Sequence, residues 1–177
     1  MHEFTVMAKV VDMNAPKTFD LDAHGAGWYS WEDINKCFWP GAGKKSVYVD
    51  PTLAEIVTSK GIYCIAWRAD GKAFPSNPAI QYIGQTSSFK SRMEQFGWSA
   101  GFWGERAPGH SAGWRWHGEK NDQMSVAFFP LPASNIPKHM LNGYLHWYEA
   151  LALDTYHKQC GSLPFVNIPK NGIVVLN

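Results

Sequence analysis

The chain has 177 residues, of which 45% are hydrophobic and 15% aromatic, and its formal net charge at pH 7 is +1. A chain of this length and apolar content can bury a hydrophobic core, and it is close to the usual size of one domain. The near-neutral charge excludes a uniformly basic nucleic-acid-binding protein, because neutralising phosphates requires clustered Lys and Arg side chains.

The hydropathy pattern and the cysteines indicate the cellular compartment of the protein. No run reaches the ~18 consecutive apolar residues that a membrane span requires, and residues 1–13 lack the basic and apolar blocks of a signal peptide. The three cysteines are widely spaced, which favours buried, reduced thiols over a disulfide framework or a zinc cluster. The sequence therefore predicts a soluble, cytoplasmic protein with no membrane partner.

The first sixty residues are rich in aromatic and turn-forming residues. The pattern predicts a short helix over Trp31–Phe38 and a strand over 46–49, after a basic turn at 41–45. The glycines of that turn do not have the spacing of a phosphate-binding loop, and a strand rather than a helix follows them. We therefore expect residues 1–58 to form an extension packed on a main domain of residues 59–177.

The main domain is expected to begin with a hairpin and a helix. Alternating apolar residues predict a strand over Gly61–Trp67, and turn formers between residues 68 and 78 predict its return as a second strand over 79–84. Apolar residues then recur at the i, i+4 and i+7 positions of one helix face, which predicts a helix over 89–97.

The second half of the chain is expected to hold a loop, a strand and a long helix. Glycine, proline and tryptophan prevent any regular period over 98–118, whereas 124–129 is apolar enough for a strand. A helix opens at Pro137, and its apolar stripe runs through Leu141, Leu145, Tyr148 and Ala152. With a last strand over 172–176, strands and helices mix without strict alternation, which indicates an α+β fold on a small sheet.

Five elements between residues 61 and 167 follow one another in a characteristic order and spacing. They are the triplet Gly61-Ile62-Tyr63, the triplet Tyr82-Ile83-Gly84 with Gln85 and Thr86 after it, Arg92 eight residues beyond Gly84, Glu149, and the segment 163–167, in which Pro164 precedes Asn167. This pattern resembles the GIY-YIG nuclease superfamily, and in particular its restriction-endonuclease-like members. The resemblance implies a three-stranded antiparallel central sheet flanked by helices.

The resemblance also implies catalytic roles. Hydrolysis of a phosphodiester requires an activated water, a Lewis acid beside the phosphate, and positive charge against the developing negative charge. Tyr63 would be the general base that takes a proton from the attacking water, and Tyr82 would position the water or the phosphate. Arg92 would stabilise the transition state through its planar guanidinium, and Glu149 would bind Mg²⁺ or Mn²⁺.

Further residues are expected to contact the substrate. They are Gly84, Gln85, Thr86, Arg106, Arg115 and Asn167. The two arginines lie in the segment 103–120, which mixes cations with aromatic rings suited to DNA. An alternative interpretation of that segment is a loop pinned by buried tryptophans.

Two features depart from the family pattern. Eighteen residues separate Tyr63 from Tyr82, more than is usual in the family, and Phe96 occupies a position where many relatives carry a histidine or a tyrosine. Lys72 and His110 are candidates to supply the missing proton-transfer group, because each can donate to a phosphate or help to deprotonate a water molecule.

The resemblance implies a Mg²⁺-dependent DNA endonuclease, most similar to a site-specific type II restriction enzyme that cuts double-stranded DNA as a homodimer. Residues 1–58 are then expected to contact DNA or the second subunit. A structure-selective repair or mobile-element nuclease and a non-catalytic nucleic-acid-binding module remain alternatives. Taken singly, Tyr63 and Tyr82 are typical sheet aromatics, and Arg92 and Glu149 are typical helix charges. The expectation therefore depends on the joint pattern.

Overall fold

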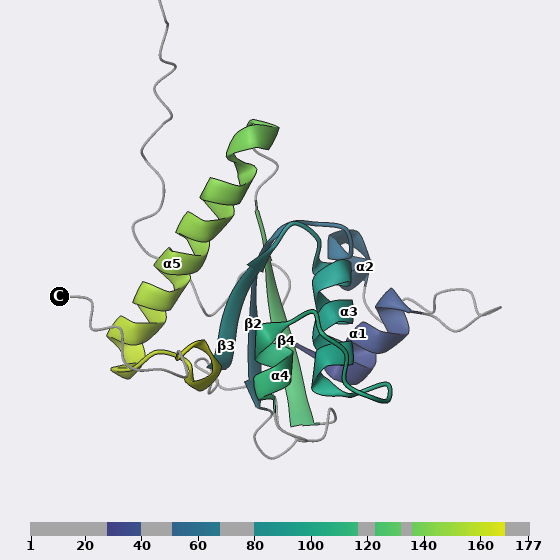
Figure 1. The fold of residues 1–177 in the computed structure, drawn as a ribbon. Helices are drawn as coiled ribbons and strands as arrows, with labels where there is room; N and C mark the ends of the chain where they lie inside the picture. The colour runs from purple at the N-terminus through teal and green to yellow at the C-terminus, as the bar shows by residue number, and fades with distance from the viewer. Residues whose placement is uncertain (1–27, 40–50, 68–79, 117–122, 132–135, 169–177) are drawn as a thin grey trace, which may run out of the picture.

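The computed structural model describes residues 28–39, 51–67, 80–116, 123–131 and 136–168 (Figure 1). These residues form a mixed α+β structure around a four-stranded antiparallel sheet with the strand order β1-β4-β2-β3. The strands are β1 (Trp28–Ser30), β2 (Gly61–Trp67), β3 (Ile80–Thr86) and β4 (Met124–Pro130). The expected strands over 46–49 and 172–176, the turn at 41–45 and Lys72 lie outside the described residues.

The described sheet has one strand more than the three-stranded sheet that the family resemblance implied. Strand β1 comes from the segment expected to be an extension, and it pairs with β4 so that Tyr29 lies opposite Val126. A strand of three residues is too short to show a period of two, so the sequence pattern did not reveal it. The predicted count of three strands is therefore wrong, whereas the mixed α+β class is confirmed.

The helices agree with the sequence pattern where that pattern is strongly periodic. Helix α1 has the predicted bounds, Trp31–Phe38, and the Ser30 hydroxyl accepts a hydrogen bond from the Asp33 amide at its start. Helix α3 (Phe89–Ala100) runs three residues past the predicted end at Gly97 and ends where Gly101 adopts a positive φ of 81°.

The last long helix is preceded by a short 3₁₀ turn. Helix α5 (Leu141–Cys160) follows the turn η2 (Lys138–Met140), and a second 3₁₀ turn, η3 (Phe165–Asn167), comes after it. The short helices α2 (Pro51–Ile56) and α4 (Ser111–Arg115) were not predicted. No described helix has both the length and the apolar character needed to cross a membrane.

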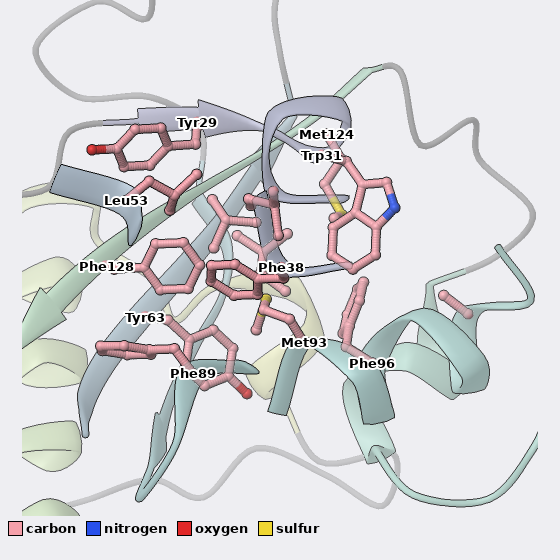
Figure 2. Close-up of a cluster of buried hydrophobic side chains, with 14 of the residues drawn as sticks. Tyr29, Trp31, Phe38, Leu53, Tyr63, Phe89, Met93, Phe96, Met124 and Phe128 are labelled. Carbon is pink, nitrogen blue, oxygen red and sulfur yellow. The ribbon is translucent and has the colours of Figure 1, made fainter. Parts of the chain in front are cut away.

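The two faces of the sheet bury separate hydrophobic clusters. Strand β2 is buried along almost its whole length, and its side chains alternate: Tyr63 and Ile65 face one cluster, whereas Ile62 and Cys64 face the other. The first cluster packs β1, β2 and β4 against α1 and α3, and Figure 2 shows its aromatic residues. The second lies beneath α5, which runs along the opposite face (Figure 1).

The buried hydrophobic residues in the described part of residues 1–58 belong to the larger of these clusters. Tyr29, Trp31 and Phe38 pack in the same buried group as Tyr63, and Phe38 contacts Phe128 of β4. The cysteines agree with expectation only in part, because Cys37 and Cys64 are buried but Cys160 is exposed. None of these three cysteines, all of which the structure describes, forms a disulfide.

Candidate functional site

The two tyrosines of the paired triplets lie side by side on one face of the sheet. Strands β2 and β3 pair so that Tyr63 is opposite Gly84 and Ile65 is opposite Tyr82. Tyr63 and Tyr82 are therefore diagonal neighbours, and their ring centroids are 5.8 Å apart. A Cβ atom at Gly84 would lie 2.7 Å from the Tyr63 hydroxyl oxygen and 2.6 Å from Tyr82 Cε1. Glycine at this position thus leaves the space that both phenols occupy.

His110 is the residue that the structure brings closest to this pair. Its Nε2 atom lies 2.6 Å from the Tyr63 hydroxyl oxygen, and its ring packs edge-on against Tyr82 and Phe96. Phe96, at the position where many relatives carry a histidine or a tyrosine, has no hydrogen-bonding group. The His110 imidazole, at the start of α4 (Ser111–Arg115), lies against the Phe96 ring. Of the two candidates for the missing group, His110 is therefore at the tyrosines, whereas Lys72 is outside the described residues.

The His110 side chain is held from several directions. Its Nδ1 atom accepts hydrogen bonds from the backbone amides of Ala112 at 3.1 Å and Gly113 at 3.4 Å. Its own amide donates to the Ser99 hydroxyl at 2.9 Å, and that hydroxyl donates to the Ala107 carbonyl. The sequence does not indicate the role of Ser99, because no pattern distinguishes a buried, hydrogen-bonded serine inside an amphipathic helix from an exposed one.

Arg92 and Glu149 approach the phenols from different helices. Arg92 is half-buried on α3, and its guanidinium donates to the Gln95 side chain at 3.1 Å. Glu149 is half-buried on α5, and one of its carboxylate oxygens lies 3.8 Å from His146 Nδ1. The charges of Arg92 and Glu149 both act on Tyr63 and on Tyr82. The four residues singled out by the sequence pattern are therefore within electrostatic reach of one another, although they lie on β2, β3, α3 and α5.

Burial dominates the electrostatics of this cluster. It raises the pKa of Tyr63 well above the ordinary phenol value and also raises the pKa of Tyr82, while the positive charge of Arg92 opposes both shifts. Burial likewise raises the pKa of Glu149, and His146 and Arg92 oppose that shift. Added positive charge beside these groups would therefore favour their ionised forms.

The buried imidazole makes the stability of the fold depend on pH. Burial, and after it the charge of Arg92, lowers the pKa of His110 from 6.5 to about 3. Between these values the unfolded chain binds one more proton at this position than the folded chain, so the free energy of unfolding falls as the pH falls, by about 1.4 kcal/mol per pH unit. Denaturant unfolding at about pH 7 and about pH 5 should show a larger loss for the wild type than for His110→Gln. Equal losses would contradict a neutral, buried His110.

The Asn167 side chain is hydrogen-bonded to the edge strand β3. Its side-chain oxygen accepts from the Ile83 amide at 2.8 Å, and its side-chain nitrogen donates to the Ile83 carbonyl at 2.7 Å. Arg115 fixes the same segment, because its guanidinium donates to the carbonyls of Val166 at 2.7 Å and Ile168 at 2.8 Å. Both residues thus hold the turn η3 against β3 next to Tyr82, which is a positioning role in addition to the expected substrate contact.

Two other expected substrate contacts also have partners within the chain. The Arg106 guanidinium donates to the carbonyls of Ser99, Gly113, Trp114 and Trp116, and it lies over the Trp114 ring. The Thr86 hydroxyl donates to the Ser88 carbonyl and accepts from the Ser88 amide, at the start of α3. These bonds shape the loops around the site.

The described part of the segment 103–120 has features of both interpretations, a surface for DNA and a loop pinned by buried tryptophans. Trp116 is buried and stacks against Trp67, whereas Trp114 is 44% exposed. Gln85, the remaining expected contact, is half-buried and lies opposite Ile62 in the β2–β3 ladder. The loop is therefore pinned by one tryptophan and presents another to solvent.

Metal binding at this site would depend on one carboxylate. Within the part of the chain that the structure describes, no three His, Cys, Asp or Glu side chains gather closely enough to hold a metal ion. Mg²⁺ is commonly held by one or two carboxylates, with water and substrate phosphates supplying the other ligands. The partly exposed Glu149 carboxylate fits that mode of binding, and its oxygen donors suit Mg²⁺ or Mn²⁺.

No protein-family model, curated protein or solved structure matches this chain.

Proposed function

We propose that the protein is a divalent-metal-dependent DNA endonuclease of the GIY-YIG type. The observation that supports this most strongly is the convergence of two phenols, one guanidinium and one carboxylate from four different elements of the fold. Tyr63 is buried, and Tyr82, Arg92 and Glu149 are half-buried. These polar and charged groups need compensation for lost hydration, which a hydrated cation with a phosphate would supply.

Each group has a part in phosphodiester hydrolysis. The Arg92 guanidinium carries paired donors that match two phosphate oxygens, so it neutralises the charge that builds up on them. The Glu149 carboxylate would hold Mg²⁺, which when bound would supply Lewis-acid polarisation of the phosphate. A phenol oxygen beside them orients the attacking water and receives its proton. Ionisation of that phenol requires positive charge near it, because burial raises the pKa of both Tyr63 and Tyr82.

The substrate proposed is double-stranded DNA, and the activity is that of a site-specific type II restriction enzyme acting as a homodimer. Two symmetric copies present two such sites to the two strands of a near-palindromic sequence. Exposed Trp98 and Trp114, with Arg106 over the Trp114 ring, provide stacking surface and positive charge near the site.

Digestion of plasmid DNA by the purified full-length chain tests this function. We expect discrete fragments with Mg²⁺ or Mn²⁺ and none with EDTA, because the reaction requires the metal. Sequencing the fragment ends would give the cleavage position. Nicking that depends on branched DNA would instead indicate a repair or mobile-element nuclease. Binding without cleavage of duplex, single-stranded or branched DNA in either metal would contradict the nuclease and favour a non-catalytic binding module.

A further inference from the structure

The hydrogen bonds around the two tyrosines have a direction. We propose that the amides of Ala112 and Gly113, the His110 ring, Tyr63 and Tyr82 form one directed hydrogen-bond chain, in which His110 is a positioning residue and Tyr82 is the phenol that meets the attacking water. This inference rests on the proposed nuclease function and exchanges the roles that the sequence pattern gives to the two tyrosines.

The position of the ring proton on His110 follows from the hydrogen bonds that the ring accepts. A backbone N–H can only donate, so the bonds from Ala112 and Gly113 require an unprotonated Nδ1. Burial keeps the ring neutral, since it lowers the pKa of His110 to about 3. A neutral imidazole has one N–H group, which is therefore on Nε2. This N–H donates to the Tyr63 hydroxyl oxygen, 2.6 Å away.

The position of that proton also sets the direction of the hydrogen bond between the two phenols. Because the Tyr63 oxygen accepts from His110, its own hydrogen is available to another acceptor. The neighbouring phenol is Tyr82, whose ring centroid lies 5.8 Å from that of Tyr63 and whose electrostatics are coupled to it, so we infer that Tyr63 donates and Tyr82 accepts. The absence of a side chain at Gly84 allows this approach, since a Cβ there would lie 2.7 Å from the Tyr63 oxygen.

The two tyrosines differ in their access to solvent. Tyr63 is completely buried, whereas Tyr82 is only partly buried and lies under the influence of Arg92, Glu149 and Arg115. With its oxygen accepting from Tyr63, Tyr82 has its own hydrogen free to point outward. A substrate water therefore meets Tyr82 first, and the Tyr63 hydroxyl behind it stabilises negative charge on the Tyr82 oxygen.

In the reaction, Tyr82 first loses its proton to bulk water. The oxygen of the attacking water then forms a bond to phosphorus, and the bond from phosphorus to the leaving sugar oxygen breaks. The proton of the attacking water passes to the Tyr82 oxygen, and the leaving oxygen takes a proton from solvent. Tyr63 and His110 keep their protons throughout, so they act by holding the Tyr82 oxygen in place.

Paired removal of the two hydroxyls tests the order of the phenols. Tyr63→Phe and Tyr82→Phe each delete one oxygen from the same ring pair. We expect Tyr82→Phe to lower kcat by about 10³-fold, and Tyr63→Phe by only about tenfold, with KM little changed in both, since a proton acceptor contributes ~10²–10⁴-fold and its supporting hydrogen bond contributes less. A greater loss of kcat in Tyr63→Phe than in Tyr82→Phe would overturn the inference.

The direction of the chain can be measured without any cleavage assay. In the ¹⁵N-labelled full-length protein, we expect the His110 ring to give the chemical shifts of a protonated Nε2 and an unprotonated Nδ1. A proton on Nδ1 would refute the directed chain. This measurement also separates two kinds of failure, since a wild-type protein that cleaves no DNA refutes the nuclease proposal while the ring tautomer still tests the hydrogen bonds.

A matched pair of substitutions tests the positioning role of His110. His110→Gln retains a side-chain N–H near the Nε2 position, whereas His110→Leu has no donor. We expect kcat to be higher in His110→Gln than in His110→Leu, with both proteins folded as judged by circular dichroism. Equal kcat in the two folded variants would contradict a role for the donor. Should neither variant fold, the tautomer measured in the wild type decides the question.

Discussion

Replacing Glu149 with alanine is expected to abolish Mg²⁺-dependent DNA cleavage while leaving the fold and DNA binding intact. A bound metal contributes several kcal/mol of transition-state stabilisation, so its loss corresponds to a fall in rate of about 10³-fold or more. The Glu149 carboxylate is half-buried near both phenols, and no cluster of metal-binding side chains among the described residues can replace it. Cleavage and Ca²⁺-supported binding of the same DNA fragment measure the two properties separately.

Asp154 provides a matched control on the same helix. Its carboxylate is exposed and pairs with Lys158 at 2.6 Å, away from the tyrosines. Asp154→Ala removes an equivalent charge from α5, and an exposed ion pair contributes at most about 1 kcal/mol to stability. We expect this variant to cleave DNA at the wild-type rate. Wild-type cleavage by Glu149→Ala, or equal losses in the two variants, would exclude Glu149 as the metal ligand.

The parts of the fold that could be predicted are those in which a local period is long enough to read. Strand β2, with seven consecutive residues, and helix α3, with a regular apolar face, were located to within a few residues. Strand β1 has three residues and helix α4 has five, so neither completes a recognisable pattern. Their formation depends on pairing with β4 and on the packing of α4 against α3, which are contacts between distant parts of the chain.

In the candidate site, too, some residues are marked by local motifs, whereas others are recognised only from contacts between distant parts of the chain. Tyr63, Tyr82, Arg92 and Glu149 could be selected because the order and spacing of short motifs mark them. His110 could be proposed only as one of two alternatives, since it lies 47 residues from the tyrosine it contacts. For Arg106 the sequence shows a cation but not its partners. Its guanidinium has five donors, and the carbonyls that it binds become visible only in the folded chain.

Replacing Arg92 with alanine is expected to lower kcat by ~10²–10³-fold without unfolding the protein, because the loss of one donor group that stabilises transition-state charge has an effect of this size. Its side chain donates to Gln95 within α3, an exposed interaction whose removal costs little stability. Arg92→Lys should recover only part of the rate, since an ammonium keeps the charge but loses the planar pair of donors.

Lys90→Ala is the control for this prediction, because it removes a positive charge from the first turn of the same helix. A loss caused by weaker general attraction of DNA would appear in both variants, would raise KM and would diminish at high salt. A loss of transition-state stabilisation would appear in Arg92→Ala alone, in kcat, and at every salt concentration. The second pattern is expected, because the charge of Arg92 acts directly on Tyr63, Tyr82 and Glu149. Equal effects of the two substitutions would reduce Arg92 to one surface cation among several.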